Sequence, residues 1–151
     1  MDIDLLLAIS HHLVVFLLVA ILAAEFALLR PGLNGAGIGQ LARIDAAYGA
    51  VAALVIVVGV LRVIFGSSGW EYYVANYAFW AKMVAFLVMG LLTIQPTLAI
   101  RRWLKASQGD ASYAIPPAEI AASRRYIHLQ VGVAVLIPIF AAAMARGYGV
   151  A

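Results

Sequence analysis

Four long apolar stretches dominate this sequence, and each is long enough to cross a membrane as a helix. A membrane-spanning helix needs roughly 20 mostly apolar residues, and the four stretches cover about residues 4–29, 43–65, 77–100 and 120–146. Hydrophobic residues make up 66% of the 151 residues and charged residues 11%, so a water-soluble fold could not cover the apolar surface. We therefore expect a single all-α integral membrane domain over residues 1–151, a four-transmembrane-helix antiparallel bundle.

The charged residues and the lack of cysteine exclude several classes of function. The net charge of +3 does not indicate nucleic-acid binding, because the Lys and Arg residues gather beside the apolar stretches, where the basic flanks of membrane spans belong. The absence of cysteine excludes disulfides, thiolate metal sites and covalently attached c-type haem.

The distribution of Lys and Arg predicts the orientation in the membrane, because short cytoplasmic loops carry the excess of these residues. The first and third connections hold or adjoin most of them: Arg30, Arg43, Arg101, Arg102, Lys105, Arg124 and Arg125. Both termini are therefore expected on the periplasmic side of a bacterial inner (plasma) membrane, which the chain crosses as a multi-pass protein. The aromatic connection between the second and third spans would then form an outer aromatic belt or a cap over a site.

Ionisable side chains inside the spans are costly in lipid and suggest either a functional site or a buried pair. In the first span His11 and Glu25 lie on nearly one face, whereas His12 points about 100° away. Each helix is expected to carry one polar, interior-facing stripe. For the fourth span the predicted stripe comprises His128, Gly132, Ile139, Ala142 and Arg146.

Alternating helix directions sort these residues into two layers. The outer layer holds a histidine and three cations, namely His11 or His12 with Arg62, Lys82 and Arg146. The inner layer holds both signs of charge and comprises Glu25, Asp45, Tyr48 and His128, with Thr97 and Arg101 beside them. The inner layer can balance its own charge, whereas the outer layer lacks an acid.

Three cations that converge in a low dielectric without an acid repel one another, unless they extend to the interface or hold an anion between them. Haem b would use both the histidine and the cations of the outer layer. A neutral imidazole of His11 or His12 would bind the iron, and Lys82, Arg62 and Arg146 would ligate it or hold the propionates. His128 lies too far along the axis to share that iron, so it either serves a second metal or cofactor site or pairs with Glu25 or Asp45.

Several short runs make the sequence resemble known membrane families. The runs are His11-His12-Leu13, residues 24–32 (AEFALLRPG), residues 43–49 (RIDAAYG), residues 79–82 (FWAK) and residues 144–147 (MARG). Over nearly the whole chain they resemble an uncharacterised family of small four-span bacterial membrane proteins, a domain of unknown function. A looser resemblance, through an early histidine and Lys82, is to the HemJ-type protoporphyrinogen IX oxidases, which implies haem and a porphyrinogen substrate. The Trp-Phe-Ala-Gly stretch of that family has no counterpart here.

The sequence leads to one main functional hypothesis and two alternatives. The main hypothesis is a cytochrome b-like haem protein with an electron-transfer or oxidoreductase role on a lipophilic substrate such as a quinone or a porphyrinogen. The first alternative is a cofactor-free, proton-coupled transporter or channel, which would need a homo-oligomer. The second is a scaffold subunit of a membrane complex, held to its partner by small-residue faces such as Gly49, Ala52, Ala53 and Gly59.

Overall fold

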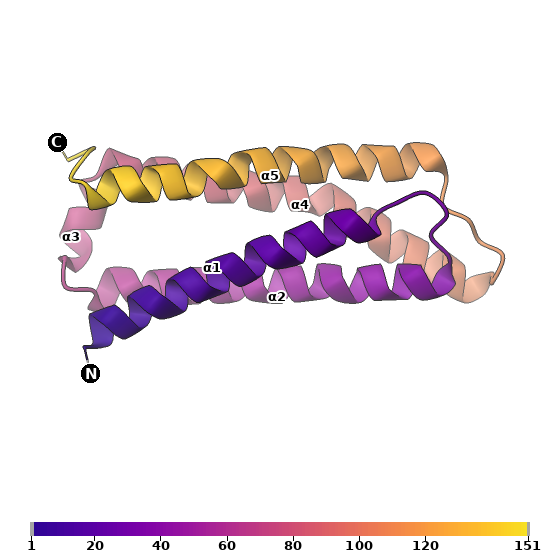
Figure 1. Ribbon diagram of the computed structural model, residues 1–151, viewed down its shortest axis with the longest axis horizontal. Helices are drawn as coiled ribbons and strands as arrows, with labels where there is room; N and C mark the ends of the chain where they lie inside the picture. The colour runs from indigo at the N-terminus through magenta and orange to yellow at the C-terminus, as the bar shows by residue number, and fades with distance from the viewer. Residues whose placement is uncertain (1, 151) are drawn as a thin grey trace.

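The computed structural model describes residues 2–150 and is all-helical over that range, apart from turns and one isolated bridge. Its helices are α1 (Ile3–Leu28), α2 (Gly35–Phe65), α3 (Gly69–Val74), α4 (Tyr77–Gly109) and α5 (Pro117–Ala145). By length and composition, α1, α2, α4 and α5 could each cross a membrane. The predicted fold class, an all-α bundle of four membrane-length helices, is confirmed (Figure 1).

The helices extend past the predicted spans at one end of the molecule. Helix α2 begins within the glycine-rich segment because the side chain of Asn34 accepts a hydrogen bond of 3.0 Å from the Gly37 amide and caps the helix. Helix α4 continues to Gly109, beyond its apolar stretch. The short helix α3 occupies part of the connection that the sequence predicted as an aromatic belt or cap.

The long helices are arranged as two antiparallel pairs. Helix α1 packs along α2, α4 packs along α5, and α2 and α4 join the two pairs, whereas α1 and α5 make little contact. Both ends of the chain and α3 lie at one end of the bundle, which we call the terminal end (Figure 1). We call the opposite end, with the connections 29–34 and 110–116, the basic end. The two pairs converge at the basic end and diverge towards the terminal end (Figure 1).

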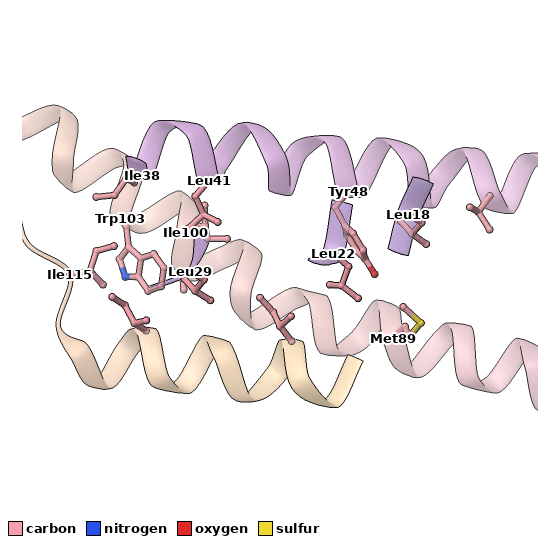
Figure 2. Close-up of a cluster of buried hydrophobic side chains, with 14 residues drawn as sticks. Leu18, Leu22, Leu29, Ile38, Leu41, Tyr48, Met89, Ile100, Trp103 and Ile115 are labelled. Atoms are coloured by element: carbon pink, nitrogen blue, oxygen red, sulfur yellow. The ribbon is translucent and has the colours of Figure 1, made fainter. Parts of the chain in front are cut away.

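The hydrophobic core lies in the middle of the bundle and at the basic end (Figure 2). Its fully buried members include Leu29, Ile100 and Trp103. The Trp103 indole donates a hydrogen bond of 2.7 Å to Glu119, which also forms an ion pair with Arg102. Within the described range, no residue of α1 before Leu18 and none of α5 after Gln130 is buried. The bundle is therefore firmly packed in one half and splayed in the other.

The terminal end is held by contacts of α3 and of the last residues. The Tyr72 hydroxyl donates a hydrogen bond of 2.8 Å to the Met144 carbonyl at the end of α5. The Tyr77 amide donates one of 2.8 Å to the Gly149 carbonyl. The side chain of Asn76 is buried and donates to the Tyr148 carbonyl. These bonds tie the C-terminal segment to the junction of α3 and α4.

Candidate functional site

The splayed half of the bundle contains a cluster of basic side chains from three helices: His11 of α1, Arg62 of α2 and Lys82 of α4. The His11 ring packs on α2 at Gly59, where an added Cβ would lie 3.4 Å from its Cε1 atom. Its Nδ1 atom and the Nε atom of Arg62 are buried and have no hydrogen-bond partner among the described residues. Buried polar atoms of this kind usually have a partner, so these two nitrogens are exceptions among the buried polar atoms of the described residues.

The surroundings of His11 are positively charged. Lys82 and Arg62 are both close enough for their charges to act on the imidazole, and Lys82 Nζ lies 5.4 Å from the centre of the Phe79 ring. Within residues 2–150 only Arg102 and Glu119 form an ion pair, so no carboxylate pairs with the cluster there. An anionic group would relieve the repulsion among these cations.

His12 and Arg146 lie outside this cluster. The His12 side chain is exposed, and its Nδ1 atom lies 2.6 Å from the Ala8 carbonyl oxygen of the same helix. The two histidine rings are 6.3 Å apart and nearly perpendicular. Arg146 is exposed at the end of α5. Of the predicted outer layer, the fold brings together His11, Arg62 and Lys82.

A second cluster of polar side chains lies in the centre of the bundle. It contains Glu25, Asp45 and Tyr48, which are buried. The carboxylate of Asp45 accepts a hydrogen bond of 2.6 Å from the Thr97 hydroxyl. Glu25 and Asp45 are near enough for their charges to interact, and Tyr48 is near both. The charge of Arg101 also reaches Asp45, although its side chain is exposed.

Gln130 of α5 belongs to this central group, and the sequence reasoning missed it. Gln130 is 2% exposed, and its side-chain amide donates hydrogen bonds to Thr93 Oγ1 at 2.5 Å and to the Met89 carbonyl at 3.3 Å. The sequence contains a pattern that could have predicted the burial of Gln130. Ile120, Ser123, Ile127 and Gln130 are spaced three and four residues apart, and this spacing places them on one helical face.

The predicted interior stripe of α5 is wrong. His128, Gly132 and Ile139 are exposed, because α5 buries the face that carries Ile127 and Gln130, and one residue further along a helix is turned by about 100°. The His128 ring packs edge-on against Phe26 at 4.6 Å. No hydrogen bond joins it to Glu25 or Asp45 in the part of the chain that is described. Its assignment to a second metal or cofactor site remains a prediction.

The basic cluster contains one histidine and two cations, and its only metal-binding side chain of the His, Cys, Asp or Glu type is His11. Between residues 2 and 150, no group of three or more His, Cys, Asp or Glu side chains is arranged to hold a metal ion. Haem needs fewer protein ligands because the macrocycle itself coordinates the iron, and its axial ligand is commonly histidine. The unpartnered His11 imidazole would provide that ligand, and Arg62 and Lys82 would pair with the propionates.

Comparison with known proteins identifies a family but no activity. Residues 3–149 match the model of a family described as "Predicted membrane protein (DUF2214)". This match confirms the resemblance to an uncharacterised membrane family. No curated protein and no solved structure matches the chain.

Proposed function

The chain belongs to the DUF2214 family of predicted membrane proteins, and we propose that this member binds haem b and has an electron-transfer or redox role. The observation that carries the proposal is the convergence of His11, Arg62 and Lys82 in the splayed half of the bundle. Among residues 2–150, the buried Nδ1 of His11 and Nε of Arg62 have no hydrogen-bond partner. A ligand that combines a metal centre with anionic groups and an apolar body would use all three side chains.

Each residue of the cluster has a distinct proposed role. His11 binds the iron through its imidazole, and Gly59 leaves room for the ring on the surface of α2. Arg62 and Lys82 would hold the propionates, and the charges of both act on His11. Bound haem supplies a one-electron couple. The proposed substrate is a lipophilic molecule such as a quinone or a porphyrinogen.

The location of the proposed site follows from the positive-inside rule. With the basic end in the cytoplasm, the cluster lies towards the periplasmic side of a bacterial inner membrane. Both termini and α3 are then periplasmic. Electrons would be exchanged near that face, with a periplasmic carrier or with a lipophilic molecule dissolved in the outer leaflet.

The adjacent histidines provide a matched test of haem binding. The protein is expressed with ample haem supply and purified in detergent. Its reduced-minus-oxidised absorption spectrum is then recorded. We expect haem bands in the wild type and in His12→Ala, and their loss in His11→Ala. Far-UV circular dichroism checks that each variant remains helical. A colourless wild-type protein, or equal loss in both histidine variants, would refute the assignment.

A second candidate function is proton-coupled transport, because Glu25 and Asp45 are only 3% and 6% exposed and interact with each other. Two buried carboxylates repel when both are charged, and a proton or a cation between them offsets that repulsion. Thr97 and Tyr48 border the pair and offer hydroxyl groups to a proton path. This function needs no cofactor.

Flux measurements separate the two candidates. Proteoliposomes are loaded with a pH-sensitive dye and subjected to an imposed potential. The transport function predicts a proton flux that is lost in Glu25→Gln and in Asp45→Asn but kept in Glu71→Gln, whose side chain is exposed on α3. Absence of flux in a protein that binds haem excludes transport as the main function.

A further inference from the structure

Two buried carboxylates in the centre of the bundle have oxygen atoms that accept no hydrogen bond. Glu25 of α1 is 3% exposed and Asp45 of α2 is 6% exposed. Within residues 2–150, no hydrogen bond or ion pair reaches the Glu25 side chain, and Asp45 accepts one through Oδ1, from Thr97. Both oxygens of Glu25 and the Oδ2 atom of Asp45 are therefore without a donor, although buried polar groups are normally hydrogen-bonded and buried charges paired.

The surroundings of this pair along the two helices are apolar. Leu22 and Leu29 lie three residues before and four residues after Glu25, and Leu41 lies four residues before Asp45. All three leucines are fully buried, and spacings of three and four residues place them beside the carboxylates on the same helical faces. An ionised carboxylate in such surroundings is costly unless a positive charge accompanies it.

The nearby basic side chains do not supply that charge to Glu25. The charges of Glu25 and Asp45 act on each other, and that of Arg101 reaches Asp45 from an exposed position. Arg124 extends to the end of α1, but its guanidinium donates to two backbone carbonyls there and forms no ion pair with Glu25. When both carboxylates are ionised, one negative charge of the pair is left over, which a single monovalent cation would offset.

The groups around the pair are also suitable ligands for a metal cation, because hard cations bind carboxylate and hydroxyl oxygens. The Thr97 hydroxyl lies 2.6 Å from Asp45 Oδ1, and the buried Tyr48 is near both carboxylates. No third acidic or imidazole side chain joins Glu25 and Asp45 in a possible metal site within residues 2–150. This composition suits a singly charged ion better than a divalent one.

We propose that Glu25 and Asp45 bind one monovalent metal cation between α1 and α2, with oxygens of Thr97 and Tyr48 completing its coordination. Na⁺ is the probe for this site. The ion offsets the repulsion between the two carboxylates and strengthens the packing of α1 on α2. The inference rests on the carboxylate pair of the second candidate function, and it is independent of haem binding.

Competition with a carboxyl reagent tests the site. Dicyclohexylcarbodiimide adds to carboxyl groups that carry a proton, whereas a carboxylate that binds a metal ion must be deprotonated. The detergent-purified protein is treated with the reagent in NaCl or in choline chloride of equal ionic strength, and labelled residues are identified by mass spectrometry. Labelling of Glu25 should slow about 10-fold when Na⁺ is at roughly ten times its dissociation constant. Labelling that Na⁺ does not slow would mean that the pair holds a proton alone, and would overturn the proposal.

Two variants show whether both carboxylates hold the ion. In Asp45→Asn, Glu25 should still be labelled, but Na⁺ should no longer protect it. Glu71→Gln is the matched control, since Glu71 is exposed on α3, and it should keep both the labelling of Glu25 and its protection. Far-UV circular dichroism checks that each variant remains helical. Protection by Na⁺ that persists in Asp45→Asn would refute a site shared by the two carboxylates.

Thermal unfolding in detergent gives a readout that does not depend on access of the reagent. Na⁺ should raise the unfolding temperature of the wild type relative to choline, because a ligand that binds the folded state stabilises it. It should leave that of Glu25→Gln unchanged. No shift in the wild type, or equal shifts in both proteins, would contradict the site. Neither measurement follows proton flux or haem absorption, so a protein that moves no protons and binds no haem can still confirm the ion.

Discussion

The Thr97 hydroxyl donates a hydrogen bond of 2.6 Å to the carboxylate of Asp45 and thereby joins α4 to α2 in the centre of the bundle. Thr97→Val keeps the shape of the side chain but removes this donor. We expect a loss of about 0.5–2 kcal/mol of unfolding free energy, measured by titration with a denaturing detergent. Thr97→Ser keeps the hydroxyl and should lose less. If Thr97→Val lost no stability, the hydrogen bond would not contribute to it.

Trp103 anchors the packed half of the bundle. It is fully buried, and its indole donates to Glu119, so Trp103→Ala should cost about 3–5 kcal/mol. Trp70, with 59% of its surface exposed on α3, provides the control, and Trp70→Ala should change stability by no more than about 0.5 kcal/mol. Thermal unfolding in detergent measures both. Similar losses in the two variants would contradict the burial of Trp103.

Arg124 holds the end of α1. Its guanidinium donates hydrogen bonds to the carbonyls of Phe26 and Leu29 and lies 4.1 Å from the centre of the Phe26 ring. Such bonds satisfy carbonyls that a helix end leaves unpaired. In Arg124→Ala, amide hydrogen exchange in the last turn of α1 should therefore accelerate about 10-fold or more. Arg125→Ala, which changes an exposed neighbour, should leave that exchange rate unaltered.

The connection between α4 and α5 should respond to acid. Asp110 accepts hydrogen bonds from the hydroxyl and the amide of Ser112, and these bonds lower the pKa of its carboxyl below the ordinary value. A lowered pKa means that the turn is stabilised while Asp110 is ionised and loses that stabilisation as the pH falls through the lowered pKa. In Ser112→Ala the pKa should rise, as measured by NMR of the Asp110 carboxyl carbon. An unchanged titration would contradict the assignment.

Reporter fusions test the proposed orientation. Alkaline phosphatase folds actively only outside the cytoplasm, so a fusion at the C-terminus should be active and one within residues 110–116 inactive. Replacing Arg101, Arg102 and Lys105 by Gln should reduce this bias, because the excess of basic residues sets the topology. Activity at the 110–116 connection of the unaltered protein would place the basic end outside.

Hydropathy predicted the number of membrane-length helices. Backbone polar groups are costly in hydrocarbon unless they are hydrogen-bonded, so a long apolar stretch in a membrane has few conformations other than a helix. Hydropathy could not show that α2 begins at Gly35, where the Asn34 cap outweighs the low helix propensity of the glycines. Nor could it show that α4 continues through Trp103 to Gly109, since that segment is polar on one face.

The candidate site was predicted in part. From the sequence, His11 and His12 were equivalent candidates for the iron ligand. Helical spacing shows that their side chains point in different directions, but it does not show which of them faces α2. In the structure the His11 ring packs on Gly59, whereas His12 is exposed. For α5, the predicted interior face was the one that carries His128 and Arg146, and this face is exposed. The buried face instead carries the uncharged amide of Gln130, whose hydrogen bonds to α4 satisfy it inside the bundle.

The divergence of the two helix pairs makes the bundle broader at its terminal end than at its basic end (Figure 1). Membrane proteins and bilayers adapt to each other's dimensions at a modest energetic cost. In a bilayer such a wedge would displace more lipid from the leaflet around its terminal end than from the leaflet around its basic end.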